Sequence, residues 1–148
     1  MKIALKYGLL TTACFIVWVL IAHWLVPDPR STVHSAGAGV FVNIVEIIAI
    51  ALGIRERKNA YAGQLSFKDG LKTGVAIAAV YVVSACLFFA VQLLLRGPGM
   101  LAIEPRAETR PMWQVVTGAF LGLSVIGVLF GLFYSTIISF IFASRRRG

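Results

Sequence analysis

Four apolar stretches, separated by short polar segments, dominate the pattern of residues along the chain. Each is roughly 20 residues long, which is enough for a helix to cross the ~30 Å hydrocarbon core of a bilayer. A segment that crosses a bilayer must satisfy its own backbone polar groups, so these stretches are expected to be helices. The pattern predicts an all-α integral membrane protein with a single domain over residues 1–148 and four transmembrane helices, at about 7–26, 36–58, 67–95 and 111–143.

The composition supports this fold class and excludes others. Apolar residues make up 59% of the chain and charged residues only 14%, and the mean hydropathy is +0.87. Soluble domains average about half apolar and about a quarter charged residues, so a soluble enzyme domain and a disordered tail are both excluded. The net charge of +8 does not indicate binding of nucleic acid, because the basic residues flank the apolar stretches. The expected surroundings are the lipid bilayer.

The basic residues are distributed unequally between the two sides of the predicted membrane. Ten lie on the side of the two termini and of the loop between the second and third helices, whereas four lie on the other side. By the positive-inside rule, both termini are expected in the cytoplasm, and the protein is expected to be a multi-pass protein of the bacterial inner membrane. Trp24 and Trp113 fall at the expected outer interface, where amphipathic rings are preferred.

The second apolar stretch has two unlike faces when it is drawn as a helix. Small and polar residues fall on one broad stripe, and bulky apolar residues fall opposite. Membrane bundles place small and polar residues against neighbouring helices and bulky residues against lipid. The stripe expected to face inward comprises Gly39, Val42, Asn43, Glu46, Ala49, Ile50 and Gly53, and the opposite one comprises Phe41, Ile44, Ile48 and Leu52.

Glu46 lies near the middle of this stretch, at a depth where a charged side chain costs on the order of 3 kcal/mol to insert. One interpretation makes it a proton or cation site, because burial favours the protonated form of a carboxyl group. The other makes it a structural contact that is hydrogen-bonded to Asn43 and a neighbouring helix. The sequence places no basic residue and no second acidic residue at the same expected depth in the membrane, which favours the structural interpretation.

The third apolar stretch offers two hydroxyl groups near the depth of Glu46. Ser84 lies near its middle, and Tyr81 lies about one turn closer to the cytoplasmic side. Either hydroxyl is able to donate a hydrogen bond to the carboxyl group, although each residue is also ordinary at a helix–helix contact. Asn43, Glu46, Tyr81 and Ser84 are therefore the candidate polar residues within the membrane.

The fourth apolar stretch contains two GxxxG motifs, one formed by Gly118 and Gly122 and the other by Gly127 and Gly131. Gly127 follows Gly118 by nine residues, which is a rotation of about 180° on a helix, so the two motifs face opposite ways. Glycine pairs of this spacing let two helices approach closely. We expect one pair to pack within the chain and the other to be available to a partner chain.

The segment between the second and third helices carries local structural signals. Gly63 is expected to turn the chain. Ser66 and Asp69 form an S-x-x-D capping pattern, which predicts that the third helix begins before the membrane. Basic residues in this segment would lie at the level of the lipid headgroups and attract anionic lipid.

No motif in the sequence indicates catalysis or a cofactor. A nucleotide-binding glycine loop, an HExxH motif, a nucleophile elbow and a cluster of carboxylates are all missing from it. His23 and His34, with Asp28 or Glu104, lie near the expected outer surface but lack the spacing of a metal site. We therefore expect no enzymatic activity, no cofactor and no metal.

Residues 53–83 carry a resemblance to a known family. The second helix ends in a Gly-Ile-basic turn, a short loop leads to a Ser-Phe dipeptide, and the third helix begins with a basic-x-Gly step; the residues are Gly53, Ile54, Arg55, Arg57, Ser66, Phe67, Lys72 and Gly74. This arrangement resembles the bacterial membrane family catalogued as domain of unknown function 4199. The resemblance implies a bacterial membrane protein with four helices, and it implies no activity, substrate or catalytic residue.

Two functions remain open at this point. The favoured hypothesis is an accessory or structural subunit of the inner membrane, which packs with itself as a homo-oligomer or with a partner membrane protein through its small-residue faces. The alternative is a small transporter or channel component that uses Glu46 as its ion or proton site. The two differ in whether the Glu46 carboxyl group is needed for folding or for transport.

Overall fold

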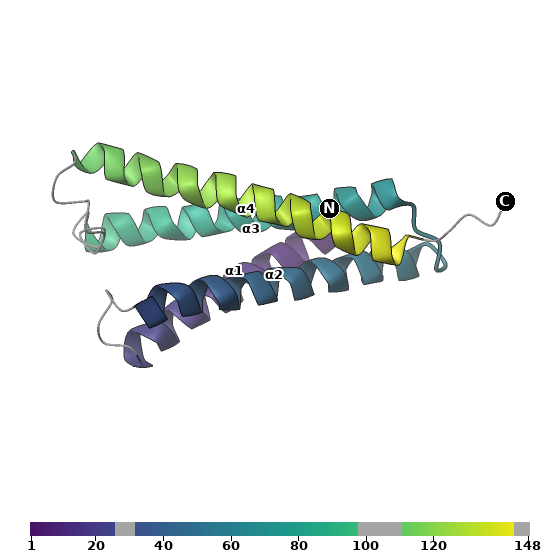
Figure 1. The fold of residues 1–148 in the computed structure, drawn as a ribbon, viewed down its shortest axis with the longest axis horizontal. Helices are drawn as coiled ribbons and strands as arrows, with labels where there is room; N and C mark the ends of the chain where they lie inside the picture. Colours follow the sequence, from purple (N-terminus) through teal and green to yellow (C-terminus); the bar gives the residue numbers. More distant parts are fainter. Residues whose placement is uncertain (26–31, 98–110, 144–148) are drawn as a thin grey trace.

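Four long α-helices make up most of the described chain (Figure 1). The structure is a computed structural model, and it describes residues 1–25, 32–97 and 111–143. Within these residues there are four helices and no strand, as the apolar pattern predicts. The helices are α1 (Lys2–Leu25), α2 (Thr32–Ala60), α3 (Phe67–Arg96) and α4 (Met112–Phe142).

The first two helices begin earlier than the apolar pattern predicts. The pattern places their starts at about residues 7 and 36, whereas α1 begins at Lys2 and α2 at Thr32. Hydropathy marks the part of a helix that suits the hydrocarbon core. The backbone hydrogen bonds of a helix continue into polar flanks, because water or headgroups can solvate the side chains there. Polar residues such as Lys2 and Lys6 therefore do not end α1.

The helices form two pairs. α1 lies beside α2 and α4 lies beside α3, while α1 also packs on α3 and α2 packs on both α3 and α4. The two pairs come close together near the turn that joins α2 to α3, and they separate toward the other end, where α1 and α3 finish (Figure 1). The bundle thus has a closed end at the 61–66 turn and an open end opposite.

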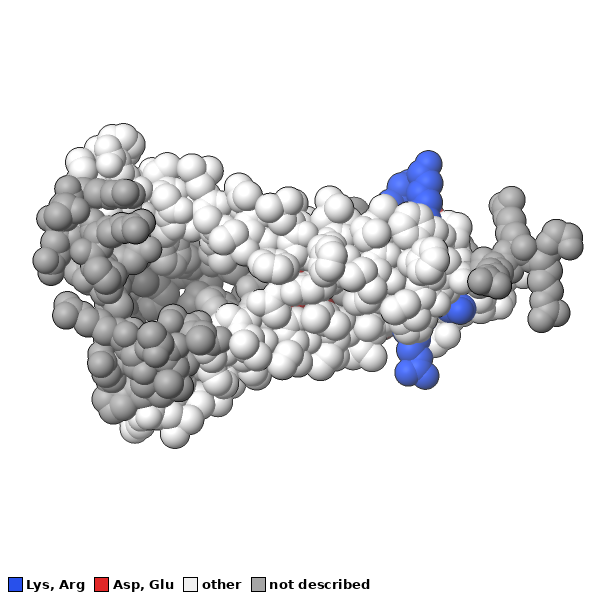
Figure 2. All heavy atoms as spheres, in the orientation of Figure 1, with Lys and Arg blue, Asp and Glu red and all other residues white. Residues whose placement is uncertain are grey.

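Three helices are long and apolar enough to cross a membrane within the described residues: Lys2–Ala22, Phe67–Leu95 and Met112–Phe142. Three such helices are compatible with a membrane protein. On the face drawn in Figure 2, the Lys and Arg side chains of the described residues gather near the closed end, and the long middle of that face is almost free of charge.

The largest apolar core lies toward the closed end. Buried residues from all four helices and from the α2–α3 turn meet there, and Ile50, Ile54 and Ile77 are completely buried. A smaller cluster around Tyr81, Val82 and Ala85 lies farther along α3. Burial of apolar surface is therefore concentrated where the two helix pairs come together.

The turn between α2 and α3 has the local structure that the sequence predicts. Gly63 adopts a φ of +82°, which is the left-handed region that glycine tolerates best. The Ser66 hydroxyl oxygen accepts a hydrogen bond of 3.1 Å from the backbone N–H of Asp69. Ser66 is the N-cap of α3, so the capping prediction is confirmed.

The faces of α2 follow the predicted stripe from Glu46 onward, whereas Gly39, which was expected to face inward, is exposed, and Val42 and Asn43 are only partly buried. Glu46, Ala49, Ile50 and Gly53 are buried, whereas Ile48 is 52% exposed on the opposite face. Ile44 and Leu52 are exposed as well, but Phe41 is an exception. Its ring stacks on that of Trp18 in α1, with 4.5 Å between the ring centroids. A large ring at the edge of the stripe reaches the neighbouring helix, which helical periodicity alone does not reveal.

Candidate functional site

A cavity of about 370 Å³ lies among the four helices on the open side of the core. Each helix contributes to its wall. The residues that matter for its chemistry are Phe15 of α1, Asn43 and Glu46 of α2, Tyr81 of α3, and Gly127 and Phe130 of α4. The wall is apolar and aromatic except for a few groups, among which Glu46 is the only one that can carry a full charge at neutral pH.

Glu46 is buried but lacks a hydrogen-bond partner for one of its oxygens. The residue is 3% exposed, and its Oε1 atom accepts no hydrogen bond from any described residue. Gly131 of α4 allows the carboxyl group to fit, because a Cβ atom at Gly131 would lie 3.1 Å from Oε1 and would overlap the side chain of Ala78. The carboxyl group therefore sits against the backbone of α4 rather than against a donor.

Asn43 is engaged elsewhere. Its side-chain N–H group donates a hydrogen bond of 2.7 Å to the carbonyl oxygen of Gly39. Its side-chain oxygen accepts a hydrogen bond from the hydroxyl group of Tyr134 in α4. The expected hydrogen bond between Asn43 and Glu46 is not formed, because the Asn43 amide links α2 to α4 instead.

The two hydroxyl groups of α3 also leave Glu46 without a donor. Ser84 donates a hydrogen bond of 2.8 Å to the carbonyl oxygen of Val80 in its own helix. Tyr81 is buried and lines the cavity with Glu46, but no hydrogen bond joins these two side chains. Of the expected polar residues, Asn43, Glu46 and Tyr81 are brought together at the cavity, while Ser84 is not part of its wall.

The charge of Glu46 is not balanced by its described surroundings. The described titratable side chains that interact with it electrostatically are the hydroxyl groups of Tyr81 and Tyr134, which are neutral at physiological pH. A buried carboxylate without a partner is expensive, and such a group takes up a proton or is paired with a cation. The site is therefore able to hold a proton, or a cation that enters the cavity.

The two glycine pairs of α4 have different surroundings. Gly127 and Gly131 pack on α3, where Cβ atoms would collide with Val82 and Ala78 respectively. At Gly118 and Gly122, a Cβ atom would meet no described atom within 4 Å. Gly122 lines the cavity, and Gly118 is exposed. Gly127 and Gly131 thus serve the contact within the chain, whereas Gly118 and Gly122 leave space for another helix.

Another close contact between α3 and α4 involves Gly74 and three residues that the sequence analysis does not name, Gly70, Ser135 and Ser139. Gly74 faces Ser135, and Gly70 faces Ser139, so closely that a Cβ atom at either glycine would overlap the serine. Both serines are completely buried. The signal in the sequence is a G-x-x-x-G spacing on α3 facing an S-x-x-x-S spacing on α4, which is the small-residue pattern of membrane helix contacts.

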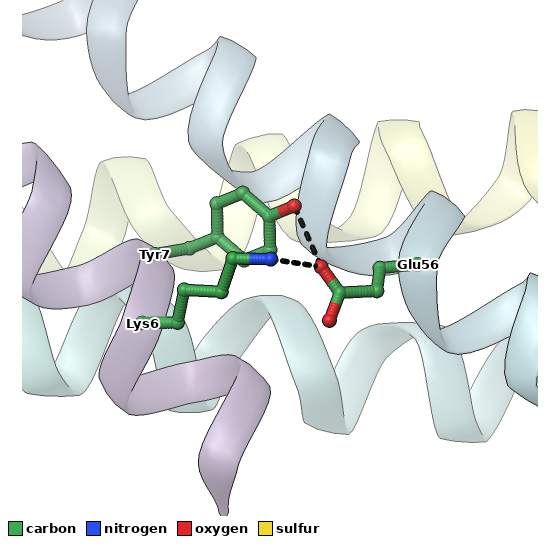
Figure 3. Close-up of polar contacts among 3 residues, drawn as sticks. All are labelled: Lys6, Tyr7 and Glu56. Atoms are coloured by element: carbon green, nitrogen blue, oxygen red, sulfur yellow. Dashed lines mark hydrogen bonds and ion pairs between the residues drawn. The ribbon is translucent and has the colours of Figure 1, made fainter.

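A second carboxyl group of α2 has partners that the sequence analysis also missed. Glu56 Oε2 accepts hydrogen bonds from Lys6 Nζ at 2.7 Å and from the Tyr7 hydroxyl at 2.8 Å (Figure 3). These hydrogen bonds, the one from Lys6 first, lower the pKa of the Glu56 carboxyl group below its usual value. Glu56 therefore ties α2 to α1 near the closed end, where it stands in a run of basic residues.

No group of three His, Cys, Asp or Glu side chains in the described ranges 1–25, 32–97 and 111–143 is placed to hold a metal ion. The four residues considered for a metal site lie outside the described side chains: His23, Asp28, His34 and Glu104. The structure thus offers the cavity beside Glu46 as the candidate site, and its chemistry is that of one carboxyl group.

No family model, curated protein or solved structure matches the chain. The resemblance of residues 53–83 concerns the end of α2, the turn and the start of α3. Most of that segment forms the closed end of the bundle, and Tyr81 is its one residue in the wall of the cavity. A function for the chain therefore has to be argued from the cavity itself.

Proposed function

We propose that this chain is a small transporter or channel component of the bacterial inner membrane, which takes up a proton or a cation at Glu46. One observation carries the proposal: a buried carboxyl oxygen without a donor among the described residues, in a side chain that lines a cavity. Ionisable residues inside membrane bundles commonly mark ion or proton pathways. We also propose that the chain is related to the bacterial membrane family that residues 53–83 resemble.

The structural interpretation of Glu46 has less support. A side chain that holds a bundle together does so through hydrogen bonds to neighbouring helices. Asn43 makes such a bond with Tyr134, but Glu46 Oε1 makes none with the residues described. A glutamate kept for structure alone would leave an unsatisfied buried group, which destabilises a protein.

The proposed topology has four spans with both termini in the cytoplasm. α2 contains 29 residues, so at about 1.5 Å per residue it exceeds the ~30 Å hydrocarbon thickness. Reporter fusions after residues 58 and 147 are expected to report the cytoplasm, and one after residue 106 the periplasm. A periplasmic signal at residue 58 would overturn this topology.

The proposed transport is tested with purified protein in liposomes that contain a pH-sensitive dye. With a potassium diffusion potential imposed, we expect wild-type protein to acidify or alkalinise the lumen faster than protein-free liposomes. Glu46→Gln keeps the size of the side chain but cannot exchange a proton, so it is expected to abolish this flux. Glu56→Gln is the matched control, because it removes a carboxylate outside the cavity. Equal flux in Glu46→Gln and wild type would reject the proposal.

A second candidate function is favoured by the open glycine pair of α4. A Cβ atom at Gly118 or Gly122 would meet no described atom within 4 Å, so another helix is able to approach this part of α4, beside the cavity that Gly122 lines. In this function the chain is an accessory subunit that packs with itself or with another membrane protein. Native mass determination in mild detergent tests it. Gly118→Leu with Gly122→Leu is expected to lower the oligomeric mass or release a partner, and an unchanged mass would exclude this contact.

A further inference from the structure

The wall of the Glu46 cavity combines one ionisable group with a large apolar surface. Phe15, Tyr81 and Phe130 bring three aromatic side chains to it, from three different helices. Glu46 and the Asn43 amide are the polar groups on α2, and the amide is already hydrogen-bonded to Gly39 and Tyr134. A ligand that fits must suit aromatic rings over most of its surface and a carboxyl group at one point.

Three simple occupants fit this wall poorly. A proton satisfies Glu46 but does not account for about 370 Å³ of apolar space. A metal cation such as Ca²⁺ or Mg²⁺ needs about six oxygen ligands, which this wall does not offer. A neutral apolar molecule fills the space but gives Glu46 Oε1 no hydrogen-bond donor, and the described residues give it none either.

We propose that the cavity binds an organic monocation with an apolar body, such as a quaternary ammonium ion that carries an aromatic group. The cationic centre lies against Glu46, and the apolar groups contact the aromatic rings. Ammonium ions are attracted to the faces of aromatic rings as well as to carboxylates, and both attractions strengthen where water is excluded. The inference rests on the proposed function, because it names the class of cation that Glu46 takes up.

The cavity is accessible from the side of the bundle. Ile126 and Phe130 of α4 line it and are 55% and 43% exposed, so they stand at its edge rather than sealing it. Two glycines, Gly39 of α2 and Gly122 of α4, also line it without a side chain that would fill it. An amphiphilic cation that partitions into the bilayer would reach the site along this side.

Binding of the cation is expected to displace a proton. The protonated carboxyl group of Glu46 releases H⁺ to solvent, and the carboxylate that remains pairs with the cation, so charge balances without another reactant. The described titratable groups that face Glu46 are Tyr81 from α3 and Tyr134 from α4, while α1 presents the ring of Phe15. Because the proton and the cation compete for one carboxyl group, affinity for the cation increases with pH.

The test compares benzyltrimethylammonium with neopentylbenzene, its neutral isostere in which carbon replaces nitrogen. Equilibrium dialysis against the protein in nanodiscs, with empty nanodiscs subtracted, gives the two affinities. We expect the ammonium ion to bind about tenfold or more tightly than the isostere, and only its affinity to increase with pH. Equal affinities, or an affinity for the ammonium ion that does not depend on pH, would overturn the inference without the use of any variant.

Three variants locate the binding. Glu46→Gln is expected to lower the affinity for benzyltrimethylammonium about tenfold or more and to leave that for neopentylbenzene unchanged. Gly39→Leu keeps Glu46 but places a side chain in the cavity, so it should weaken both ligands. Glu56→Gln, the matched control, should bind as wild type does. Unaltered binding of the ammonium ion in Glu46→Gln would reject the site. Flux that depends on Glu46 without such binding would leave the proposed function standing and reject this ligand class alone.

Discussion

The two carboxyl groups of α2 lie ten residues apart and have opposite surroundings. Glu56, near the closed end, is partly exposed and accepts hydrogen bonds from Lys6 and Tyr7 (Figure 3). Glu46, at the cavity, is buried, and its Oε1 accepts none from the described residues. The exposed group, which water could solvate, has two partners, and the buried group, which needs them, lacks a partner on one oxygen.

This difference follows the division of the bundle into two ends. At the closed end, small residues let the helices approach closely, and Lys58 donates a hydrogen bond to the carbonyl oxygen of Phe142. Buried polar atoms without a partner occur at this end as well: Ser135 Oγ, Ser139 Oγ and Arg57 Nε. At the cavity, the helix pairs diverge (Figure 1). Among the described side chains with an unsatisfied buried atom, Glu46 is the one that lines the cavity. We therefore assign stability to the closed end and ligand chemistry to the cavity.

The largest expected effect is at the closed end. Gly74→Leu should sharply reduce the yield of folded protein, because the new side chain would overlap Ser135 and Ile50. Overpacking of this kind costs about 1–3 kcal/mol or more. The control is Gly118→Leu, where a Cβ atom meets no described atom within 4 Å and the change in stability should stay below about 0.5 kcal/mol. Monodisperse yield and Tm measure both, and equal losses would mean that the two ends do not differ in packing.

A smaller effect is expected at the start of α3. Ser66→Ala removes the hydroxyl group that accepts the N–H of Asp69, and loss of such a cap costs about 1 kcal/mol. Ser66→Asn is the matched control, since asparagine also caps helices well. In thermal denaturation, wild type should have the highest Tm, Ser66→Asn an intermediate Tm and Ser66→Ala the lowest. A Ser66→Ala variant as stable as wild type would show that tertiary packing alone sets the start of the helix.

The Glu56 contact predicts a pH dependence of stability. Its folded pKa is lower than the usual value of 4.5, so the carboxylate stabilises the fold above that pH, and the contribution is lost as pH falls through the lowered pKa. We expect Glu56→Gln to have a slightly lower Tm than wild type at neutral pH, and the two values to converge in acid. A difference in Tm that persists at low pH would contradict the assignment. Because the group is exposed, the effect should also weaken with salt.

The smallest effect on stability is expected at Glu46. Glu46→Gln should change the free energy of unfolding by less than about 0.5 kcal/mol, because no described donor bonds to Oε1. Glu46→Leu should not reach the cost of about 1 kcal/mol that the loss of an interhelical hydrogen bond would bring. Tm measurements in the same detergent test both variants. A clear drop in Tm for Glu46→Leu, with recovery in Glu46→Gln, would restore the structural interpretation of this residue.

The sequence by itself determined the helical class, the approximate extents of the helices and the inward face of α2 from Glu46 to Gly53. The physical reason is that these features depend on residues close together in the chain. A long apolar segment must be helical in lipid, the Ser66 cap involves a residue three positions away, and helical periodicity defines which residues share a face. Glu46 was recognisable for the same reason, since its depth follows from its position in one stretch.

Only the tertiary structure decided which faces meet and which polar groups are satisfied. Asn43 pairs with Tyr134, and Glu56 pairs with Lys6. Both partners are far away in the sequence, and other residues of the same types could have taken their places. The contact of Gly70 and Gly74 with two serines of α4, and the cavity left where the pairs diverge, likewise depend on how all four helices pack at once. Packing is a property of the complete set of contacts, so the unpaired state of Glu46 is visible only after every neighbour has been placed.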